Sequence, residues 1–371
     1  MKSIKEVMHL TGTRVLIRAS LNVPIENGKI LNDFRLKRAQ ETIAWCAARG
    51  AKVIVISHLG DEPTNSLRPV ADLLNNTTPV SFVDDVVGAR AEAAVSAMKN
   101  GDILILENLR REKGEKENNE EFAQKLARFG DVYVNDDFAA AHRAHASIVS
   151  LPKLLPAYAG LLFMKEFEAL SNARAPQSPS LCIIGGAKFL TKEPIIQSAL
   201  ITYDKVFVTG ALANDFFKAL GYETGVSLLS PVALDLKNVL QNSKLILPTD
   251  VSVQTSEGRE VKKPQQVEKP DNMLDVGPAT MNVISPLVAK SRFILWNGPL
   301  GNYEKGFTEY TEQLAQLIAA SPATSIVGGG DTIASIARLG LENKFTFLST
   351  AGGAMLEFIA KGTLPGIQAL T

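Results

Sequence analysis

Glycine and lysine residues gather in the segment SLCIIGGAKFLTKEP, residues 180–194, in a pattern suited to binding a phosphate. An apolar run ends in Gly185 and Gly186, and Lys188 and Lys192 follow. A strand that ends in glycines and leads into a helix presents backbone N–H groups to an anion. The common P-loop has a different spacing, in which four residues separate a glycine from Gly-Lys-Ser/Thr. The segment therefore predicts a phosphate-binding loop of another type.

The ends of the other apolar runs carry different chemistry in the two halves of the chain. In the first half they carry Arg18, Asn22, His58, Arg110, His142 and Arg143, and in the second half Gly210, Gly298, Gly301, Gly328–Gly330 and Gly352–Gly353. Guanidinium and imidazole groups bind small, densely charged anions, whereas glycines let backbone N–H groups approach nucleotide phosphates. Asp331, followed by Thr332, suits Mg²⁺ held against phosphates. One domain for an anionic metabolite and one for a nucleotide is the layout of a small-molecule kinase.

Buried parallel strands must position these residues. Apolar runs rich in Val, Ile and Leu do not alternate with polar residues, as expected of strands covered on both faces. They lie at 14–21, 51–57, 102–109, 131–136, 181–186, 205–210, 245–250, 293–298, 325–330 and 345–350. Stretches with helical spacing, such as 35–48 and 117–129, separate them. This alternation predicts an α/β protein with doubly wound, Rossmann-like parallel sheets.

The length of 371 residues favours two domains rather than one. Prolines and a small-residue turn near 150–160, followed by a helical stretch and then Pro-Gln-Ser-Pro-Ser, indicate a linker. We predict a first domain over 1–155, a linker helix over 156–177 and a second domain from 178 to 350.

The composition excludes several classes of protein. A formal net charge of zero gives no sign of a nucleic-acid or membrane-surface partner. The N-terminus is too polar for a signal peptide, and no apolar run approaches the roughly 20 residues that cross a bilayer. The two cysteines, Cys46 and Cys182, lie in apolar contexts and are expected to be buried thiols in a reducing, cytoplasmic compartment.

Several segments together resemble the phosphoglycerate kinase family, in the family's order and over nearly the whole chain. They are RVLIRASLNVP, SHLG, LENLR, YVNDDFAAAHRAHAS, GGAKFLTK, WNGPLGNYE, GGGDT and STAGGA. The resemblance implies two Rossmann-like domains joined by a hinge helix, with a C-terminal segment, 351–371, that returns to the first domain. It also implies a monomer that transfers phosphoryl between 1,3-bisphosphoglycerate and ADP, giving 3-phosphoglycerate and ATP with Mg²⁺, and that closes about its hinge.

The resemblance also implies roles for individual residues. Arg35 looks like the arginine that stabilises the transferring phosphoryl group, and Lys188 and Lys192 match lysines that steer the phosphates. Asp331 matches the aspartate that holds the metal–nucleotide complex, and Glu304 matches a ribose contact. The implied substrate ligands are Arg110, Arg143, His58 and Asn22, with Arg18 and His142 in support. The implied nucleotide loops hold Gly185, Gly186, Ala187, Gly210, Asn297, Pro299, Gly328, Gly329, Gly330 and Thr332.

Two departures from the family's pattern fall in the substrate half. Ser20 stands where an aspartate is usual, and Asp61 stands where an arginine is usual. A carboxylate beside a charged substrate weakens binding unless another cation, Arg111 or Arg68, replaces the missing arginine. Alternatively, Asp61 points to solvent and its loop is displaced. Alanines replace other usual residues at Ala139, Ala140, Ala211, Ala279 and Ala351.

Three functions remain open at this point. The first is an active phosphoglycerate kinase. The second is a related acyl-phosphate kinase with a different substrate, since the departures cluster in the substrate half. The third is a nucleotide-binding interaction protein without turnover, against which the presence of Arg35, Lys188, Lys192 and Asp331 argues.

Overall fold

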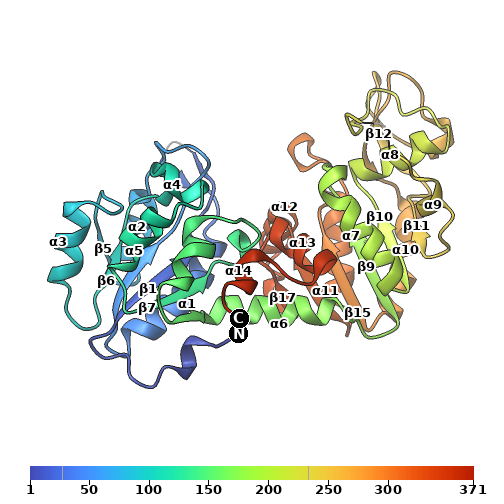
Figure 1. The fold of residues 1–371 in the computed structure, drawn as a ribbon. Helices are drawn as coiled ribbons and strands as arrows, with labels where there is room; N and C mark the ends of the chain where they lie inside the picture. Colours follow the sequence, from blue (N-terminus) through green and yellow to red (C-terminus); the bar gives the residue numbers. More distant parts are fainter. Residues whose placement is uncertain (27, 233) are drawn as a thin grey trace. The chain divides into compact units, whose positions relative to one another are not determined.

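The computed structural model describes residues 1–26, 28–232 and 234–371. It divides into two compact units (Figure 1). The first unit comprises Met1–Glu168 together with Thr363–Thr371, and the second comprises Ala169–Gly362. In the described part of the chain, no helix has the length and apolar character needed to cross a membrane.

The first unit contains a six-stranded, wholly parallel sheet in the order β5-β6-β4-β1-β7-β8. Its strands are β1 (Arg14–Ala19), β4 (Lys52–Ile56), β5 (Ser81–Phe82), β6 (Ile103–Ile105), β7 (Val132–Asp136) and β8 (Ala157–Ala159). The helices are α1 (Phe34–Ala47), α2 (Arg68–Asn75), α3 (Ala89–Ala97), α4 (Lys113–Lys116), α5 (Glu120–Ala127) and α14 (Pro365–Gln368). A short hairpin, β2 (Ile25–Glu26) and β3 (Lys29–Ile30), precedes α1.

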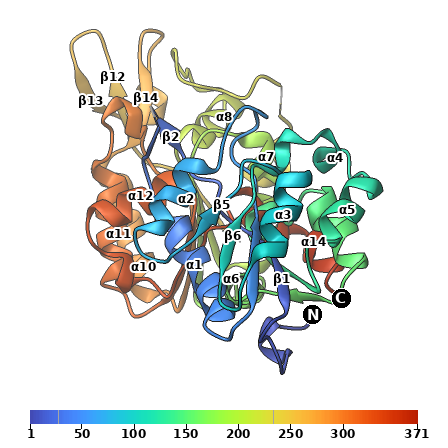
Figure 2. The same cartoon turned by 90° about the vertical axis from the view of Figure 1, so that its left-hand side faces the viewer.

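Alternate residues of the central strands are buried on opposite faces of this sheet. Val15 and Val53 share one apolar core with residues of α1 and α2. Figure 2 shows α1 and α2 on one side of the strands labelled β5 and β6. Leu16 and Ile54, which point to the other face, are also buried. Both faces are therefore covered, which explains why these strands are apolar throughout rather than alternating.

The second unit contains a parallel sheet in the order β11-β10-β9-β15-β16-β17. Its strands are β9 (Ser180–Ile184), β10 (Lys205–Val208), β11 (Leu245–Ile246), β15 (Phe293–Asn297), β16 (Thr324–Gly328) and β17 (Phe347–Leu348). The helices are α7 (Phe189–Thr202), α8 (Ala211–Ala219), α9 (Lys237–Leu240), α10 (Pro278–Lys290), α11 (Glu309–Ala319), α12 (Gly330–Arg338) and α13 (Gly353–Lys361). The strand order changes direction between β9 and β15, which is where doubly wound sheets bind ligands.

The predicted fold class is confirmed, and each of the ten apolar runs overlaps a strand. A three-stranded antiparallel sheet was not predicted. It consists of β12 (Val251–Gln254), β13 (Arg259–Lys262) and β14 (Asn272–Val276). Its outer strand, β13, is mostly exposed and polar, so it lacks the apolar run that marks the buried strands.

Two expected boundaries differ from the structure. The segment expected to be one linker helix over 156–177 holds β8, which pairs with β7, and then α6 (Leu161–Ala173). The C-terminal segment that belongs to the first unit begins at Thr363 rather than at 351. The reason is that α13, within the expected segment, packs against α7 of the second unit.

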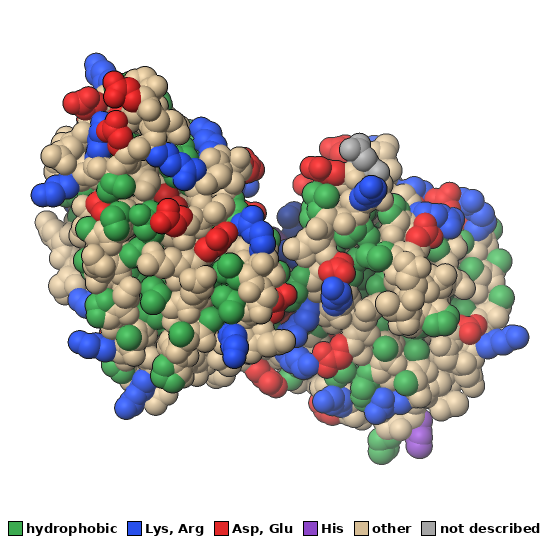
Figure 3. Space-filling model, turned by 180° about the vertical axis from the view of Figure 1, so that it is seen from behind, with side chains coloured by type: hydrophobic (Ala, Val, Ile, Leu, Met, Phe, Trp, Pro, Cys, Tyr) green, Lys and Arg blue, Asp and Glu red, His purple; other side chains and the backbone are tan. Residues whose placement is uncertain are grey.

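The surface agrees with the absence of net charge. On the face shown in Figure 3, basic and acidic side chains are interspersed over each unit.

The two cysteines are free and buried, as predicted from their apolar contexts.

Candidate functional site

A buried ion pair forms where the strand order of the first sheet changes direction. Arg18 lies at the end of β1 and Asp137 directly after the neighbouring strand β7. The Arg18 Nη1 atom lies 2.6 Å from Asp137 Oδ2, and both side chains are buried. Arg18 also donates to Ser147 Oγ at 3.1 Å. These contacts fix the guanidinium among the strand ends.

His58 is a neutral hydrogen-bond donor beside this pair. Its pKa is held well below the usual value by burial and by the charges of Arg18, Arg110 and Arg143. The Nδ1 atom lies 2.7 Å from Arg18 Nη2. Because a guanidinium can only donate, Nδ1 accepts and the ring proton is on Nε2. A neutral imidazole that carries its proton on Nε2 can donate to an anion without adding charge.

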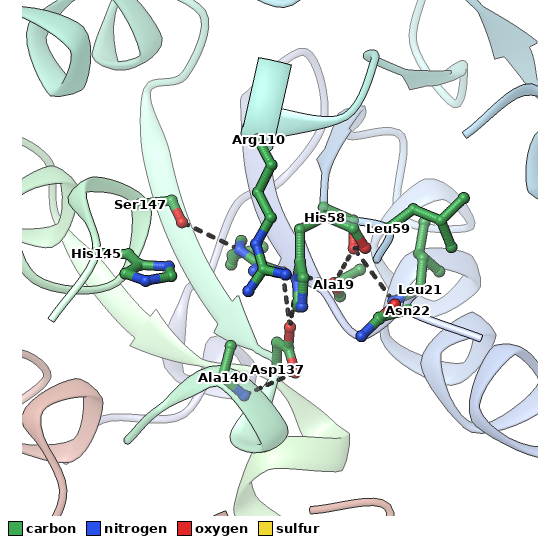
Figure 4. Close-up of polar contacts among 12 residues, drawn as sticks. Ala19, Leu21, Asn22, His58, Leu59, Arg110, Asp137, Ala140, His145 and Ser147 are labelled. Carbon is green, nitrogen blue, oxygen red and sulfur yellow. Dashed lines mark hydrogen bonds and ion pairs between the residues drawn. The ribbon is translucent and has the colours of Figure 1, made fainter. Parts of the chain in front are cut away.

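Arg110 brings a second buried guanidinium to the same place. It lies in a short 3₁₀ helix, Leu109–Arg111, that follows β6. Burial, together with Arg143 and Arg18, lowers its pKa, which means that these three cations are close enough to repel one another. In the described part of the chain, its Nε is buried without a hydrogen-bond partner. Figure 4 shows Arg110, His58 and His145 converging from separate elements.

The segment after the 3₁₀ helix Phe138–Ala140 completes this cluster. Arg143 is exposed and His142 is half-buried. Burial and the charges of Arg110, Arg143 and Arg18 lower the pKa of His145 to about 4. His145 is therefore neutral near pH 7, and the cluster presents guanidinium cations among neutral imidazoles. Such a surface is suited to a small, multiply charged anion.

Arg35 is tied to the cluster through Asn22. The Arg35 Nη1 atom donates to the backbone oxygen of Asn22 at 2.9 Å. The Asn22 Oδ1 atom in turn accepts from the backbone N–H of Gly60 at 2.9 Å. Ser20, which precedes Asn22 in the same segment, is buried. α1 and the loop after β4 are thus linked at the rim of the cluster.

Asp61 contacts one of the clustered arginines instead of lying apart from them. Its Oδ1 atom lies 2.5 Å from Arg110 Nη1, although 75% of the Asp61 side chain is exposed. Neither expected substitute cation faces this point. Arg111 pairs with Asp84 at 2.6 Å and with Glu107 at 2.8 Å. Arg68 lies over the ring of Phe82. The Asp61 side chain is thus largely exposed, as the alternative interpretation expected, but its carboxylate also pairs with Arg110.

In the second unit, glycines line the point where the strand order changes. A Cβ placed on Gly185 would lie 2.2 Å from the backbone oxygen of Pro299. Gly210 has φ of 64°, and a Cβ there would lie 2.7 Å from the backbone nitrogen of Gly186. Only glycine permits these backbone segments to approach so closely. The strand ends consequently form a smooth floor of backbone atoms.

The Lys192 ammonium lies on this floor. It donates to the backbone oxygen of Gly185, and it lies 2.8 Å from where a Cβ on Gly298 would be. Burial lowers the pKa of Lys192 to about 8, and Asp331 opposes that shift. Lys188, by contrast, is exposed at the N-terminal boundary of α7. Of the two lysines, Lys192 extends its ammonium from the first turn of α7 to the glycine loop.

A cavity of about 550 Å³ extends from the glycine floor. One wall is apolar and includes Phe217, Leu228 and Met273, whereas Glu304 and Asp331 supply carboxylates. Its other lining residues among the predicted nucleotide ligands are Gly186, Ala187, Gly210 and Pro299. The apolar residues suit a flat, weakly polar group of a ligand, and the glycines let the rest of that ligand approach the backbone closely.

The loop between β16 and α12 adds polar groups to this floor. Gly328, Gly329 and Gly330 lead into Asp331, which is exposed in the first turn of α12. The next residue, Thr332, is buried, and its Oγ1 has no hydrogen-bond partner among the described residues. Asn297 is buried at the end of the adjacent strand β15. A carboxylate beside an unpartnered hydroxyl is suited to a metal-bound phosphate.

Comparison with known proteins relates both sites to one family. A sequence model of the family described as "Phosphoglycerate kinase" matches residues 4–361. The chain belongs to the phosphoglycerate kinase family. The family predicted from the sequence motifs is therefore confirmed.

Individual relatives match over almost their whole length. "Phosphoglycerate kinase" of Dictyoglomus turgidum is 40% identical, with 97% of this chain and 96% of the relative covered. That of Moorella thermoacetica is also 40% identical, with 98% of each covered. The structure of phosphoglycerate kinase from Coxiella burnetii superposes with a TM-score of 0.84 at 39% identity, covering 99% of this chain and 98% of that one. The Pyrococcus horikoshii enzyme gives 0.89 at 30% identity, covering 100% and 98%.

Some residues of the two sites were not predicted. Asp137, the partner of Arg18, directly follows a predicted strand in YVNDD. Its position at a strand end could have identified it as a site residue. Asp275 lines the nucleotide-side cavity, and burial raises its pKa to about 7. The apolar wall of that cavity comes from distant segments, and no local pattern distinguishes its residues from ordinary core.

Proposed function

We propose that this chain catalyses reversible phosphoryl transfer between 1,3-bisphosphoglycerate and ADP, giving 3-phosphoglycerate and ATP, as a cytoplasmic monomer. The observation that carries the proposal is that the two units hold sites of different chemistry. A cluster of guanidinium groups and neutral imidazoles lies in one unit. The other unit holds a cavity lined in part by glycines, and the partly buried Lys192 ammonium donates to the backbone oxygen of the neighbouring Gly185. Membership of the family supports the same activity.

The cluster in the first unit binds 3-phosphoglycerate. Arg110, Arg143 and the Nε2–H of His58 contact its negatively charged groups, and the ion pair with Asp137 holds Arg18 in place behind them. The other residues of this site are Ser20, Asn22 and His142. The acceptor oxygen belongs to a carboxylate that is already ionised, so the reaction needs no general base.

The cavity in the second unit binds the nucleotide. Its apolar residues take the base and Glu304 takes the ribose. The glycine loops, with Lys192 and Lys188 beside them, take the phosphates. The residues also fit Mg²⁺, since one carboxylate, Asp331, and the unpartnered Thr332 hydroxyl are enough when phosphates and water supply the remaining ligands. When bound, Mg²⁺ neutralises charge on the phosphates.

Transfer from ATP forms a bond between the γ-phosphorus and the substrate's carboxylate oxygen and breaks the bond to the β-phosphate oxygen. Such a reaction is accelerated mainly by alignment and by neutralising charge. Lys192 and Arg35 supply positive charge to the transferring group. Because the two ligands bind to different units, the reaction also requires a hinge motion about the linker that contains α6, which brings the ligands together and excludes water.

The pairing of Asp61 with Arg110 favours one second candidate, a related kinase that acts on a different carboxylate. A coupled assay with ATP and 3-phosphoglycerate tests both. We expect turnover with 3-phosphoglycerate and little with acetate or glycerate at equal concentration. Turnover with another carboxylate only would support the second candidate, and no turnover with any acceptor would support a binding protein.

A further inference from the structure

In the proposed substrate site, the carboxylate of Asp61 already pairs with the guanidinium of Arg110. Only 3% of the Arg110 side chain is exposed, and its Nη1 donates both to Asp61 Oδ1 and to the backbone oxygen of Gly60. The same Arg110 belongs to the group of cations that act on His58 and His145. Asp61 therefore satisfies a donor that faces the anion-binding cluster.

The backbone around Asp61 is held independently of its carboxylate. The N–H of Gly60 donates to Asn22 Oδ1 at 2.9 Å, and the N–H of Leu59 donates to Asn108 Oδ1 at 3.2 Å. Lys116 Nζ donates to the backbone oxygen of Asp61 at 2.9 Å. The side chain, by contrast, is mostly exposed. The carboxylate can thus rotate into solvent while the loop stays in place.

We infer that Asp61 is an internal ligand of Arg110, which an anionic group of the substrate must displace. The inference rests on the proposed function, since it assigns the cluster to 3-phosphoglycerate. In this account the aspartate lowers substrate affinity in two ways. It occupies a donor of Arg110 before substrate arrives, and it adds a negative charge near the bound phosphate.

A purely structural role explains the pair less well. An ion pair whose carboxylate is this exposed contributes little to stability. Loop position is already fixed by the contacts of Gly60, Leu59 and Lys116. Removing the Asp61 charge should therefore leave the fold intact and release Arg110 for an external anion.

The test compares Asp61→Asn with the matched control Glu62→Gln. Both substitutions remove one negative charge from the same exposed loop, but only Asp61 is in contact with Arg110. Sulfate is titrated at constant ionic strength, and binding is followed by NMR of the ring C–H resonances of the four histidines. We expect Asp61→Asn to bind sulfate about threefold to tenfold more tightly than the natural chain, from the modest strength of an exposed pair and the lost repulsion. Glu62→Gln should match the natural chain within about twofold.

Kinetics give the second readout. Asp61→Asn should lower the KM for 3-phosphoglycerate by a similar factor, with a smaller effect on kcat, because the contact is made equally in ground and transition states. Asp61→Arg should lower it further. Equal sulfate affinity in Asp61→Asn and the natural chain overturns the inference even if the enzyme is active. Tighter sulfate binding without turnover of 3-phosphoglycerate by any form supports the internal ligand and rejects the proposed function.

Discussion

At the scale of single residues, Lys192 and Arg110 show how burial prepares a cation for an anionic ligand. Each side chain donates to a backbone oxygen, Gly185 for the lysine and Gly60 for the arginine. Burial lowers the pKa of both groups. A partly desolvated lysine held by a backbone oxygen gains more from an incoming phosphate than a solvated surface cation does. Arg110 differs, because it already pairs with Asp61.

Removing either cation assigned to the transferring phosphoryl group should cut turnover. We expect Lys192→Ala and Arg35→Ala each to lower kcat by roughly 10²–10³, the usual loss for one group that stabilises a transition-state charge. Steady-state kinetics measures the effect. The control is Lys37→Ala, which removes an exposed cation from the same helix as Arg35 and should retain near-normal turnover. Retention of most activity in either test variant would refute its assignment.

The lowered pKa of Lys192 makes nucleotide binding dependent on pH. Below a pH of about 8 the free protein already carries the charged lysine, whereas above it the lysine is mostly neutral. Bound phosphates favour the charged form, so binding takes up close to one proton at about pH 9 and much less at about pH 7.5. Affinity for Mg-ADP should accordingly fall as the pH rises through 8. Calorimetry in buffers of different ionisation enthalpy measures the uptake, and Lys192→Ala should abolish it.

Residue types could be predicted at the site, but their pairings could not. The glycines, lysines and arginines are recognisable because their chemistry is encoded in their types and their spacing along the strand ends. The contact of Asp61 with Arg110 joins residues 49 positions apart in sequence. Sequence proximity suggested Arg111 and Arg68 as partners of the site, yet Asp84, Glu107 and Phe82 engage those two arginines.

At the scale of elements, the strand ends decide where the nucleotide can lie. β9 and β15 are neighbours at the point where the second sheet changes direction, and Gly185 and Gly298 follow them directly. Strands buried on both faces are long apolar runs and could be predicted. The hairpin strand β13 could not, because its residues are exposed and resemble a loop.

The close approach after β9 predicts the effect of Gly185→Ala. The added Cβ would meet the backbone oxygens of Pro299 at 2.2 Å and of Gly298 at 2.8 Å, so the backbone must move. We expect a loss of about 1–3 kcal/mol in the free energy of unfolding, together with weaker nucleotide binding. Gly353→Ala is the matched control, since a Cβ there meets no atom within 4 Å. Denaturant unfolding compares the two, and equal stability would contradict the description of a crowded glycine floor.

At the scale of the whole molecule, each unit has its own sheet and one of the two proposed sites. This two-part organisation could be predicted because the pattern of buried strands is interrupted by a proline-rich stretch. The exact boundaries could not be predicted, because the composition of α13 does not reveal which of the two units this helix packs against. Its assignment to the second unit depends on its packing against α7.

Separate sites predict that both ligands are needed for compaction. Each ligand alone contacts one unit, so only the pair gains free energy when the units approach. Small-angle scattering should show a smaller radius of gyration with Mg-nucleotide and 3-phosphoglycerate together than with either alone. Full compaction with Mg-ATP alone would show that closure does not depend on the acceptor.

The return of the last nine residues to the first unit has a consequence for synthesis. The N–H of Gly366 donates to the backbone oxygen of Ala141 at 2.8 Å, and Leu364, Ile367 and Leu370 are buried. A ribosome delivers the N-terminal end first, and N-terminal domains generally fold first. Here the N-terminal unit is complete only once residues 363–371 have left the exit tunnel, after the continuous second unit, Ala169–Gly362, has been synthesised. The part of the enzyme that is translated first is therefore the part that is finished last.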